Sequence, residues 1–296
     1  MVSYQKTFGD RIFDFVIYFL VAVIIIITLY PLIYTFSMAI SDPIEAARGH
    51  VFLLPKGFDL TAIKTVLSDK DIVTYYGNTL WYTVVGTVLG IVFTCLAAYP
   101  ISRPEFKARK TITKIILFTM FFSGGLIPTY IVIAKYLHLY NSRWAIIINK
   151  LTTAWYILVA KSFFESLPKE IAESARIDGA SEYRIFAQLY VPLSKPVLAV
   201  LALYYAVSYW NGYFTAMLYL GKKELQPLSL YVRSLVIQGN LNNLGSEAVK
   251  LDSKALLSTM QIKYAVIVVS VLPMLLIYPF LSKNLEKGIL IGSVKG

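Results

Sequence analysis

The chain has 296 residues, of which 57% are hydrophobic and 15% charged, and its formal net charge at pH 7 is +11. The apolar residues gather in runs of about 20, the length that a helix needs to cross a bilayer core, which excludes an ordinary soluble domain. The basic residues are scattered over many polar segments without aromatic platforms between them, so the charge indicates contact with anionic lipid and not with nucleic acid.

The apolar runs predict a single transmembrane domain, residues 1–296. Lipid offers no hydrogen-bond partner to backbone amides, so every run must be helical and the fold class is all-α integral membrane. Six spans are expected, at residues 13–40, 76–99, 112–137, 142–164, 194–220 and 263–283. The first run is too long for the apolar part of a secretory signal and no small-residue cleavage site follows it, so we expect it to remain as a span. An even number of spans places both termini on one side.

Residue types that catalysis or ion-coupled transport would need are scarce. His50 and His138 are the only histidines and Cys95 the only cysteine, which excludes an H-E-x-x-H zinc site, a thiolate metal cluster and an intrachain disulfide. No G-x-x-x-x-G-K-[ST] phosphate loop is present. Asp14 is the only carboxylate within the expected spans, which disfavours a proton- or sodium-coupled carrier. We therefore expect no enzyme activity, cofactor or metal in this chain, and an energy source outside it.

The polar segment 165–193 predicts two short helices. In the first, Pro168 suits the first turn and Ser166 is a candidate cap. Its apolar stripe, spaced every fourth residue, consists of Leu167, Ile171 and Ala175. Gly179 is expected to end this helix, residues 168–178, in the left-handed conformation.

Ser181 is expected to cap the second helix and Pro192 to end it. Its apolar residues are Ile185, Phe186 and Leu189. By local physics alone, such a hairpin could rest on lipid headgroups and serve only to connect two spans.

The same segment closely resembles the EAA loop of permease subunits in binding-protein-dependent ABC importers. The resemblance rests on Glu173-Ser174-Ala175-Arg176-Ile177-Asp178-Gly179 and on Leu189-Tyr190-Val191-Pro192. Ser174 replaces the central Ala of the pattern and Val191 replaces Leu, and both changes are conservative. The resemblance implies that the first helix is a coupling helix, which sits in a groove of a separate ATPase. The residues to which it assigns this coupling are Glu173, Ser174, Ala175, Asp178, Gly179 and Pro192.

Within that assignment, the resemblance makes Glu173 the anion that meets a basic residue of the ATPase. It makes Gly179 the required turn, and Ala175 the small residue that permits close approach of the partner. It also places segment 165–193 and both termini in the cytoplasm. The positive-inside rule adds a small bias in the same direction, chiefly from the loop with Arg103 and Lys107.

The resemblance covers nearly the whole chain and indicates the MalG-like carbohydrate permeases. The string Phe122-Ser123-Gly124-Gly125-Leu126-Ile127-Pro128-Thr129-Tyr130 and the tail Ile291-Gly292-Ser293-Val294-Lys295-Gly296 are similar to the LplC/YtcP-like branch. That branch includes importers of complex oligosaccharides, among them alginate-type uronates. The implied fold is the MetI/MalG-like permease fold, with six transmembrane helices and a cytoplasmic coupling-helix hairpin. The segment 221–262 then corresponds to an outer loop, which in maltose-type importers enters the cleft of the binding protein.

The resemblance also implies partners and a location. They are a second homologous permease, two ATPase subunits that bind ATP and Mg, an extracytoplasmic solute-binding protein, a saccharide substrate and the lipid of a bacterial cytoplasmic (inner) membrane. The chain itself would hold no nucleotide.

A path for sugars needs hydroxyl-binding groups and aromatic rings that stack on the CH faces of sugar rings. Candidates within the expected spans are Asn78, Trp81, Tyr82, Tyr130, Lys150, Trp155, Tyr156, Tyr209, Trp210, Asn211 and Tyr213. Many aromatic residues of a membrane protein belong instead to interfacial belts or to packing. Lys150 either extends to the outer interface or contacts an acidic saccharide or a carboxylate of the partner permease. Gly86-x-x-x-Gly90 predicts close helix packing.

These features together predict a permease subunit of an ABC importer that moves an oligosaccharide or polysaccharide into the cytoplasm by ATP-driven alternating access. An acidic, alginate-like saccharide is among the candidate substrates. The alternatives are the same architecture importing a non-sugar solute, a secondary carrier and a membrane scaffold.

Overall fold

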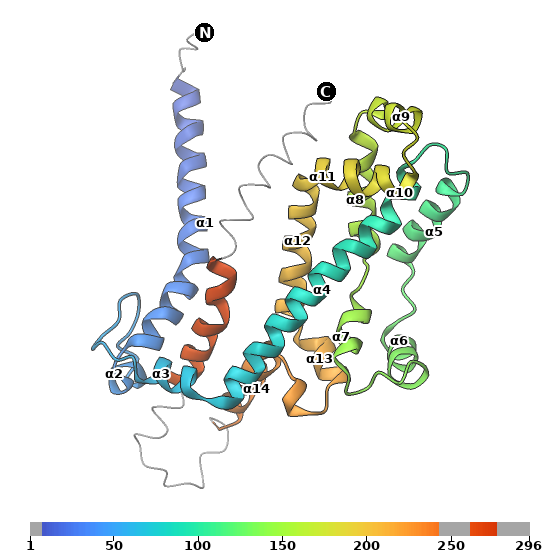
Figure 1. Cartoon of the computed structure of the whole chain (residues 1–296). Coiled ribbons are helices and arrows are strands. Elements are labelled where there is room, and N and C mark those ends of the chain that lie inside the picture. Colours follow the sequence, from blue (N-terminus) through green and yellow to red (C-terminus); the bar gives the residue numbers. More distant parts are fainter. Residues whose placement is uncertain (1–7, 243–260, 277–296) are drawn as a thin grey trace. The chain divides into compact units, whose positions relative to one another are not determined.

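The computed structural model describes residues 8–242 and 261–276, and these residues are helical apart from turns, loops and one isolated bridge between Ser41 and Phe58 (Figure 1). The all-α prediction is thus confirmed over this part of the chain. Segment 243–260 of the expected outer loop, residues 277–283 of the sixth expected span and the 291–296 tail motif lie outside the described residues. The chain divides into two compact units, Met1–Asp69 with Leu235–Val271 (unit 1) and Lys70–Ser234 with Leu272–Gly296 (unit 2).

Unit 1 is built on the long apolar helix α1 (Phe8–Ile40), followed by α2 (Pro43–Ala47) and α3 (Thr61–Ser68). Asp42 caps α2, because its carboxylate accepts hydrogen bonds from the amides of Ile44 (2.8 Å) and Glu45 (3.4 Å). The C-terminal end of α1 packs against the helix Gln261–Leu276, where Gln261 donates to the Ser41 carbonyl. Most of α1 is apolar on every side and exposed, as expected of a helix that contacts lipid.

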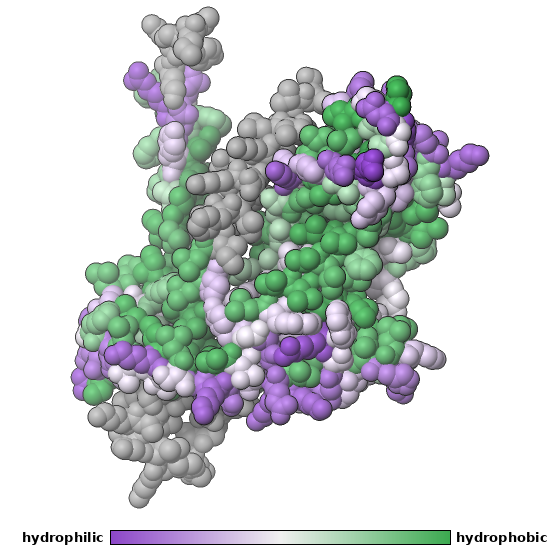
Figure 2. Space-filling view, in the orientation of Figure 1, coloured by the Kyte–Doolittle hydropathy of each residue, from purple (hydrophilic) through white to green (hydrophobic). Residues whose placement is uncertain are grey.

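Unit 2 is organised around α4 (Lys70–Ser102), against which α8 (Ala154–Ser166) and α12 (Lys195–Trp210) pack. The other elements of unit 2 are α5 (Arg109–Phe121), α6 (Leu126–Ile131), η1 (Val132–Tyr136), α7 (Arg143–Asn149), α9 (Lys169–Ile177), α10 (Glu182–Ile185), η2 (Phe186–Tyr190), α11 (Val191–Leu193), α13 (Tyr213–Tyr219), η3 (Lys223–Leu225) and the first part of α14 (Leu228–Asn242). Figure 2 shows hydrophobic side chains over the middle of this unit and hydrophilic ones gathered at the end that holds α9 and α10.

The packing of α4 on α12 depends on two glycines. A Cβ atom at Gly90 would lie 2.7 Å from the Tyr205 ring, and one at Gly86 would overlap the Tyr209 ring. Each tyrosine ring therefore occupies a notch that a side chain would fill. The prediction that Gly86-x-x-x-Gly90 serves close helix packing is confirmed.

Several apolar runs are broken rather than continuous. Helices 109–121 and 126–136 meet at a bend of 111°, where Gly125 has φ +86°. The run 142–164 divides into α7 and α8, and the run 194–220 into α12 and α13. Among the described residues, α1 and α4 are long and apolar enough to cross a membrane, and four spans result if each of two bent pairs counts as one. The six-span topology therefore stays a prediction.

Candidate functional site

The hairpin predicted at 165–193 is formed by α9, a turn at Gly179, and α10 continuing into η2. Gly179 has φ +77° directly after α9, as predicted. Ser181 caps α10 through a hydrogen bond that its hydroxyl accepts from the Arg184 amide (3.4 Å). These two local predictions are confirmed.

Two other local predictions are wrong. Ser166 does not cap α9, because its hydroxyl donates to the Phe163 carbonyl (2.7 Å) within α8 and Pro168 occupies the cap position. Pro192 does not end the second helix, since it lies inside α11 in the first turn after η2, where a missing amide is tolerated. The chain bends after α11 instead, by 79° between residues 182–193 and 195–210.

One face of the hairpin packs on unit 2. Ala172 and Ile185 are fully buried in the main hydrophobic core, and Ala175 packs against that core. Glu173 and Ser174 lie on the exposed face of α9, and Asp178 is exposed at its end. Ala175 therefore contacts its own chain, whereas Glu173 is free to meet a partner.

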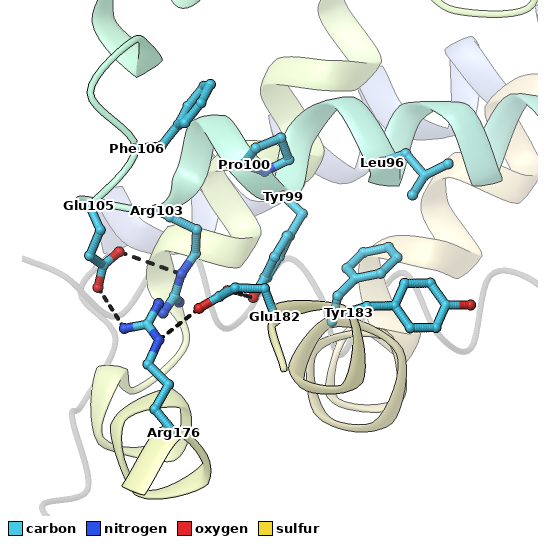
Figure 3. Close-up of a pocket in the computed structure, with 10 residues that line it drawn as sticks. Leu96, Tyr99, Pro100, Arg103, Glu105, Phe106, Arg176, Glu182 and Tyr183 are labelled. Carbon is cyan, nitrogen blue, oxygen red and sulfur yellow. Dashed lines mark hydrogen bonds and ion pairs between the residues drawn. The ribbon is translucent and has the colours of Figure 1, made fainter. Parts of the chain in front are cut away.

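Arg176 joins the hairpin to the loop that follows α4 (Figure 3). Its Nε donates to Glu182 Oε1 (2.7 Å) and its Nη1 to Glu105 Oε1 (2.9 Å). Tyr99, near the end of α4, donates its hydroxyl to the other oxygen of Glu182 (2.8 Å). One guanidinium thus connects both helices of the hairpin with residue 105.

The pKa values of this network move in the directions that ion pairing predicts. The hydrogen bond from Arg176 lowers the pKa of Glu105, and the two carboxylates raise the pKa of Arg176, Glu105 having the larger effect. Partial burial would raise the pKa of Glu182, but the hydrogen bonds from Arg176 and Tyr99 outweigh it and the net shift is downward. All three groups are therefore charged at neutral pH.

Arg103 forms a second connection, one layer deeper. It is 8% exposed, donates from Nη1 to the Tyr190 hydroxyl, and its guanidinium carbon lies 5.1 Å from the Tyr190 ring centroid and 5.7 Å from that of Tyr99. Tyr99 also packs edge-on against Phe164 of α8. The end of α4, the hairpin and α8 thus share one aromatic cluster around a buried cation.

Two apolar side chains of the hairpin point into solvent. Ile177 is 87% exposed and Tyr183 is 76% exposed. Tyr183 borders a pocket of about 470 Å³, whose apolar walls include Leu96, Phe106 and Phe186 (Figure 3). The sequence analysis did not select Ile177 and Tyr183. Both lie off the buried apolar stripe of their helix, and this position could have predicted their exposure. Exposed apolar residues beside an exposed carboxylate are suited to a protein contact.

The residues proposed to line a substrate path do not form one cluster. Asn78 and Tyr82 are buried and hold the segment 224–226: Asn78 Nδ2 donates to the Glu224 carbonyl (2.7 Å) and the Tyr82 hydroxyl to the Leu225 carbonyl (2.8 Å). Arg143 donates to Asn78 Oδ1 (2.9 Å) and lies over the Trp81 ring. Three of the candidates thus meet around Arg143, a residue that the sequence reasoning did not select.

A second group surrounds α12. The Tyr209 hydroxyl donates to the Ile147 carbonyl (3.1 Å), and Lys150 Nζ to the Ser208 carbonyl (2.9 Å). Asn211 and Tyr213 are exposed at the break between α12 and α13, close to Lys150. The other candidates are dispersed: Tyr130 stacks on Tyr219, Tyr156 on Tyr204, Trp210 is buried against Tyr76, and Trp155 is exposed. Within the described residues, no group of three or more His, Cys, Asp or Glu side chains could hold a metal ion.

Comparisons with known proteins agree over almost the full length. Residues 1–291 match the family model described as "Binding-protein-dependent transport system inner membrane component". Protein LplC of Bacillus subtilis (strain 168) is 38% identical over 292 residues, covering 99% of this chain and 98% of LplC. The polygalacturonan/rhamnogalacturonan transport system permease protein YtcP of the same organism is 36% identical, covering 97% of this chain and 99% of YtcP.

Solved structures of similar fold are also ABC transporter components. A chain from the crystal structure of a bacterial ABC transporter involved in the import of the acidic polysaccharide alginate is 36% identical, with a TM-score of 0.85, covering 95% of this chain and 99% of that one. A second structure, of a bacterial alginate ABC transporter in complex with an alginate pentasaccharide-bound periplasmic protein, matches with a TM-score of 0.62 at 16% identity, which bears on the fold alone.

Proposed function

Because this chain belongs to the family of binding-protein-dependent transport system inner membrane components, we propose that it is a permease subunit of an ABC importer for an acidic oligosaccharide or polysaccharide. The relatives support the substrate class: YtcP is named for polygalacturonan and rhamnogalacturonan transport, and the similar solved structure concerns alginate import. All three of these saccharides contain carboxylate-bearing sugar units.

The single observation that carries the proposed mechanism is the two-sided hairpin. Its outer face presents Glu173 with exposed Ile177. Its inner face is bonded to the loop after α4 through Arg176 and Glu105, and to α4 itself through Glu182 and Tyr99. A partner ATPase that engages the outer face would move the hairpin and the end of α4 together. Such rigid-body motion is a common way of gating a membrane path.

The helix α4 suits the transmission of this motion. It has 33 residues, so it is about 50 Å long, and it packs along α12 through the glycine notches at Gly86 and Gly90. A displacement at its hairpin end therefore reaches the far end of unit 2 without passing through a flexible loop. The hairpin and both termini would lie in the cytoplasm of a bacterial cell, and the segment 221–262 on the outer side.

The proposal includes partners that this chain needs. A second homologous permease would complete the path, two ATPase subunits would bind ATP with Mg, and a solute-binding protein would deliver the saccharide. The chain itself would contribute no catalytic residue.

Affinity purification of the tagged chain from its native membrane in a mild detergent tests this function. Recovery of an ATPase, a second permease and a solute-binding protein is the expected result, and that binding protein should bind uronate-containing oligosaccharides. Recovery of the chain alone, or with copies of itself only, would favour a carrier or a scaffold. Recovery of the full set with a binding protein that prefers peptides or phosphate esters would retain the importer and reject the saccharide.

A further inference from the structure

Some cations of unit 2 are paired with carboxylates and others are not. At the hairpin end, Arg176 pairs with Glu105 and Glu182, and Lys161 pairs with Glu165. Near the break between α12 and α13, Lys150 and Arg233 each lie over a tyrosine ring. In the part of the chain that the structure describes, neither of these two cations forms an ion pair with a carboxylate.

The break itself consists of Asn211 and Gly212, between Trp210 at the end of α12 and Tyr213 at the start of α13. Asn211 is exposed, and its Nδ2 donates to the Val207 carbonyl (3.1 Å), a bond that does not use its side-chain oxygen. In transporters, discontinuous helices provide polar groups for the substrate, because irregular backbone is tolerated at membrane depth where it lines a cavity or a water-filled path.

Lys150 approaches the break from the end of α7. Its Nζ donates to the Ser208 carbonyl (2.9 Å), lies 5.9 Å from the Tyr209 ring centroid, and would lie 2.9 Å from a Cβ atom at Gly212. An ammonium group has three donors, so this contact positions the charge and leaves two donors for another acceptor. Placing a half-buried charge within an apolar run costs free energy unless the charge pairs with another group or binds a ligand.

Arg233 approaches the same break from α14. Its guanidinium carbon lies 5.5 Å from the ring centroid of Tyr213, whose side chain is 41% exposed. A guanidinium that rests on an aromatic face keeps its edge of N–H donors available, and that edge matches the two oxygens of a carboxylate. Lys150 therefore contacts the end of α12 and Gly212, and Arg233 contacts the ring of the next residue, Tyr213.

We infer that the break between α12 and α13, flanked by Lys150 and Arg233, is a binding site for the carboxylate-bearing sugar units of the transported saccharide. Each cation would bind a sugar carboxylate, Tyr213 would stack on the CH face of a sugar ring, and Asn211 would bind a hydroxyl. The inference rests on the proposed function and adds to it the residues that select an acidic substrate. Arg143 has a different role, because its guanidinium is used within the chain to hold Asn78.

Uptake measurements in the native host test this site with chemically matched probes. The acidic probes are short oligogalacturonates and alginate oligosaccharides, and the neutral probes are the same oligosaccharides with methyl-esterified carboxylates. The variants are Lys150→Gln and Arg233→Gln. Lys222→Gln and Lys223→Gln are the matched controls, since each removes one positive charge from an exposed side chain of the segment that follows α13.

We expect each site variant to raise the half-saturating concentration of the acidic probe by about tenfold or more, as loss of one charged contact does. The neutral probe and both control variants should change less than about twofold, and Lys150→Arg should recover most of the loss. Chain abundance in the membrane and co-purification of the ATPase serve to show that the variants assemble.

Equal effects on acidic and neutral probes, or no effect on either, would overturn the inference while the importer assignment stands. Wild-type uptake of neutral saccharides with no preference for the acidic probe would do the same. A wild-type chain that imports no saccharide at all would overturn the proposed function first, and this site with it.

Discussion

Arg176 Nη1 donates to Glu105 Oε1 over 2.9 Å, and this bond joins residues that are 71 positions apart in the sequence. It fastens the hairpin to the loop that follows α4. The Arg176 side chain is 31% exposed and the Glu105 side chain 53% exposed. This ion pair therefore contributes more to fixing the position of the hairpin than to the free energy of folding.

Arg176→Gln should reduce the number of substrate molecules transported per ATP hydrolysed, because one of the bonds that fasten the hairpin to the segment at the end of α4 would be lost. The loss of thermal stability should be small, about 1 kcal/mol or less, since exposed ion pairs contribute little. Transport and ATPase activity measured together in reconstituted vesicles check this. Lys161→Gln is the control, because its ion pair with Glu165 lies within α8 and joins no two elements; a similar loss of coupling there would contradict the assignment.

The same network predicts a pH dependence. The pKa of Glu105 is lower in the folded chain than its ordinary value of 4.5, so the unfolded chain binds more protons as the solution is acidified. The stabilisation is therefore complete above about pH 4.5 and is lost as pH falls through the lowered pKa. Glu105→Gln should weaken this fall in thermal stability, measured by unfolding in detergent, and a pH profile identical to that of the wild type would count against the ion pair.

Glu173→Arg should separate ATP hydrolysis from transport while leaving the chain folded, because Glu173 is exposed and has no described contact to lose. Charge reversal at an interface typically costs several kcal/mol when it faces a like charge. Pull-down of the ATPase by the variant chain measures the effect. Glu165→Arg, also exposed and acidic but engaged with Lys161, is the control; equal weakening by both would mean that net charge, not position, governs docking.

Ile177→Ser should weaken the association with the ATPase by about 1–2 kcal/mol, the amount expected when an exposed apolar contact is lost on binding. The folded chain itself should be unaffected, since the side chain is 87% exposed. Leu54, which is 77% exposed and lies in unit 1, provides a matched substitution, Leu54→Ser. Equal effects of the two on ATPase binding would reject the hairpin as the docking surface.

Gly90→Ala should destabilise unit 2 by about 1–3 kcal/mol, because the added methyl group would lie 2.7 Å from the Tyr205 ring in a packed helix pair. Gly77→Ala, on the same helix, meets no atom within 4 Å and should be neutral or slightly stabilising. Thermal unfolding of the purified chains compares them. Similar melting temperatures for the two variants would show that the notch does not hold α4 on α12.

The composition and the motifs were enough to identify an all-helical membrane permease. Long runs of apolar residues indicate membrane helices directly. The Gly179 turn and the Ser181 cap depend only on neighbouring residues, so these two features were predicted correctly. Ser166 and Pro192 were misassigned because two local solutions compete at each place. A serine can cap the next helix or bond to its own, and a proline can end a helix or begin its next turn.

Residue types and local patterns thus determined the class and the hairpin, and the motif resemblance singled out Glu173. Only the tertiary structure decided which cations are paired. Arg176 meets Glu105 because α4 and the hairpin pack at one end of unit 2, whereas Arg143 meets Asn78, and Lys150 and Arg233 lie over tyrosines, at contacts formed by distant segments. The sequence shows where a charged side chain is, but not which group it pairs with. The pairing depends on which helices pack together, and helix packing depends on side-chain shape, such as a tyrosine ring that fits a glycine notch.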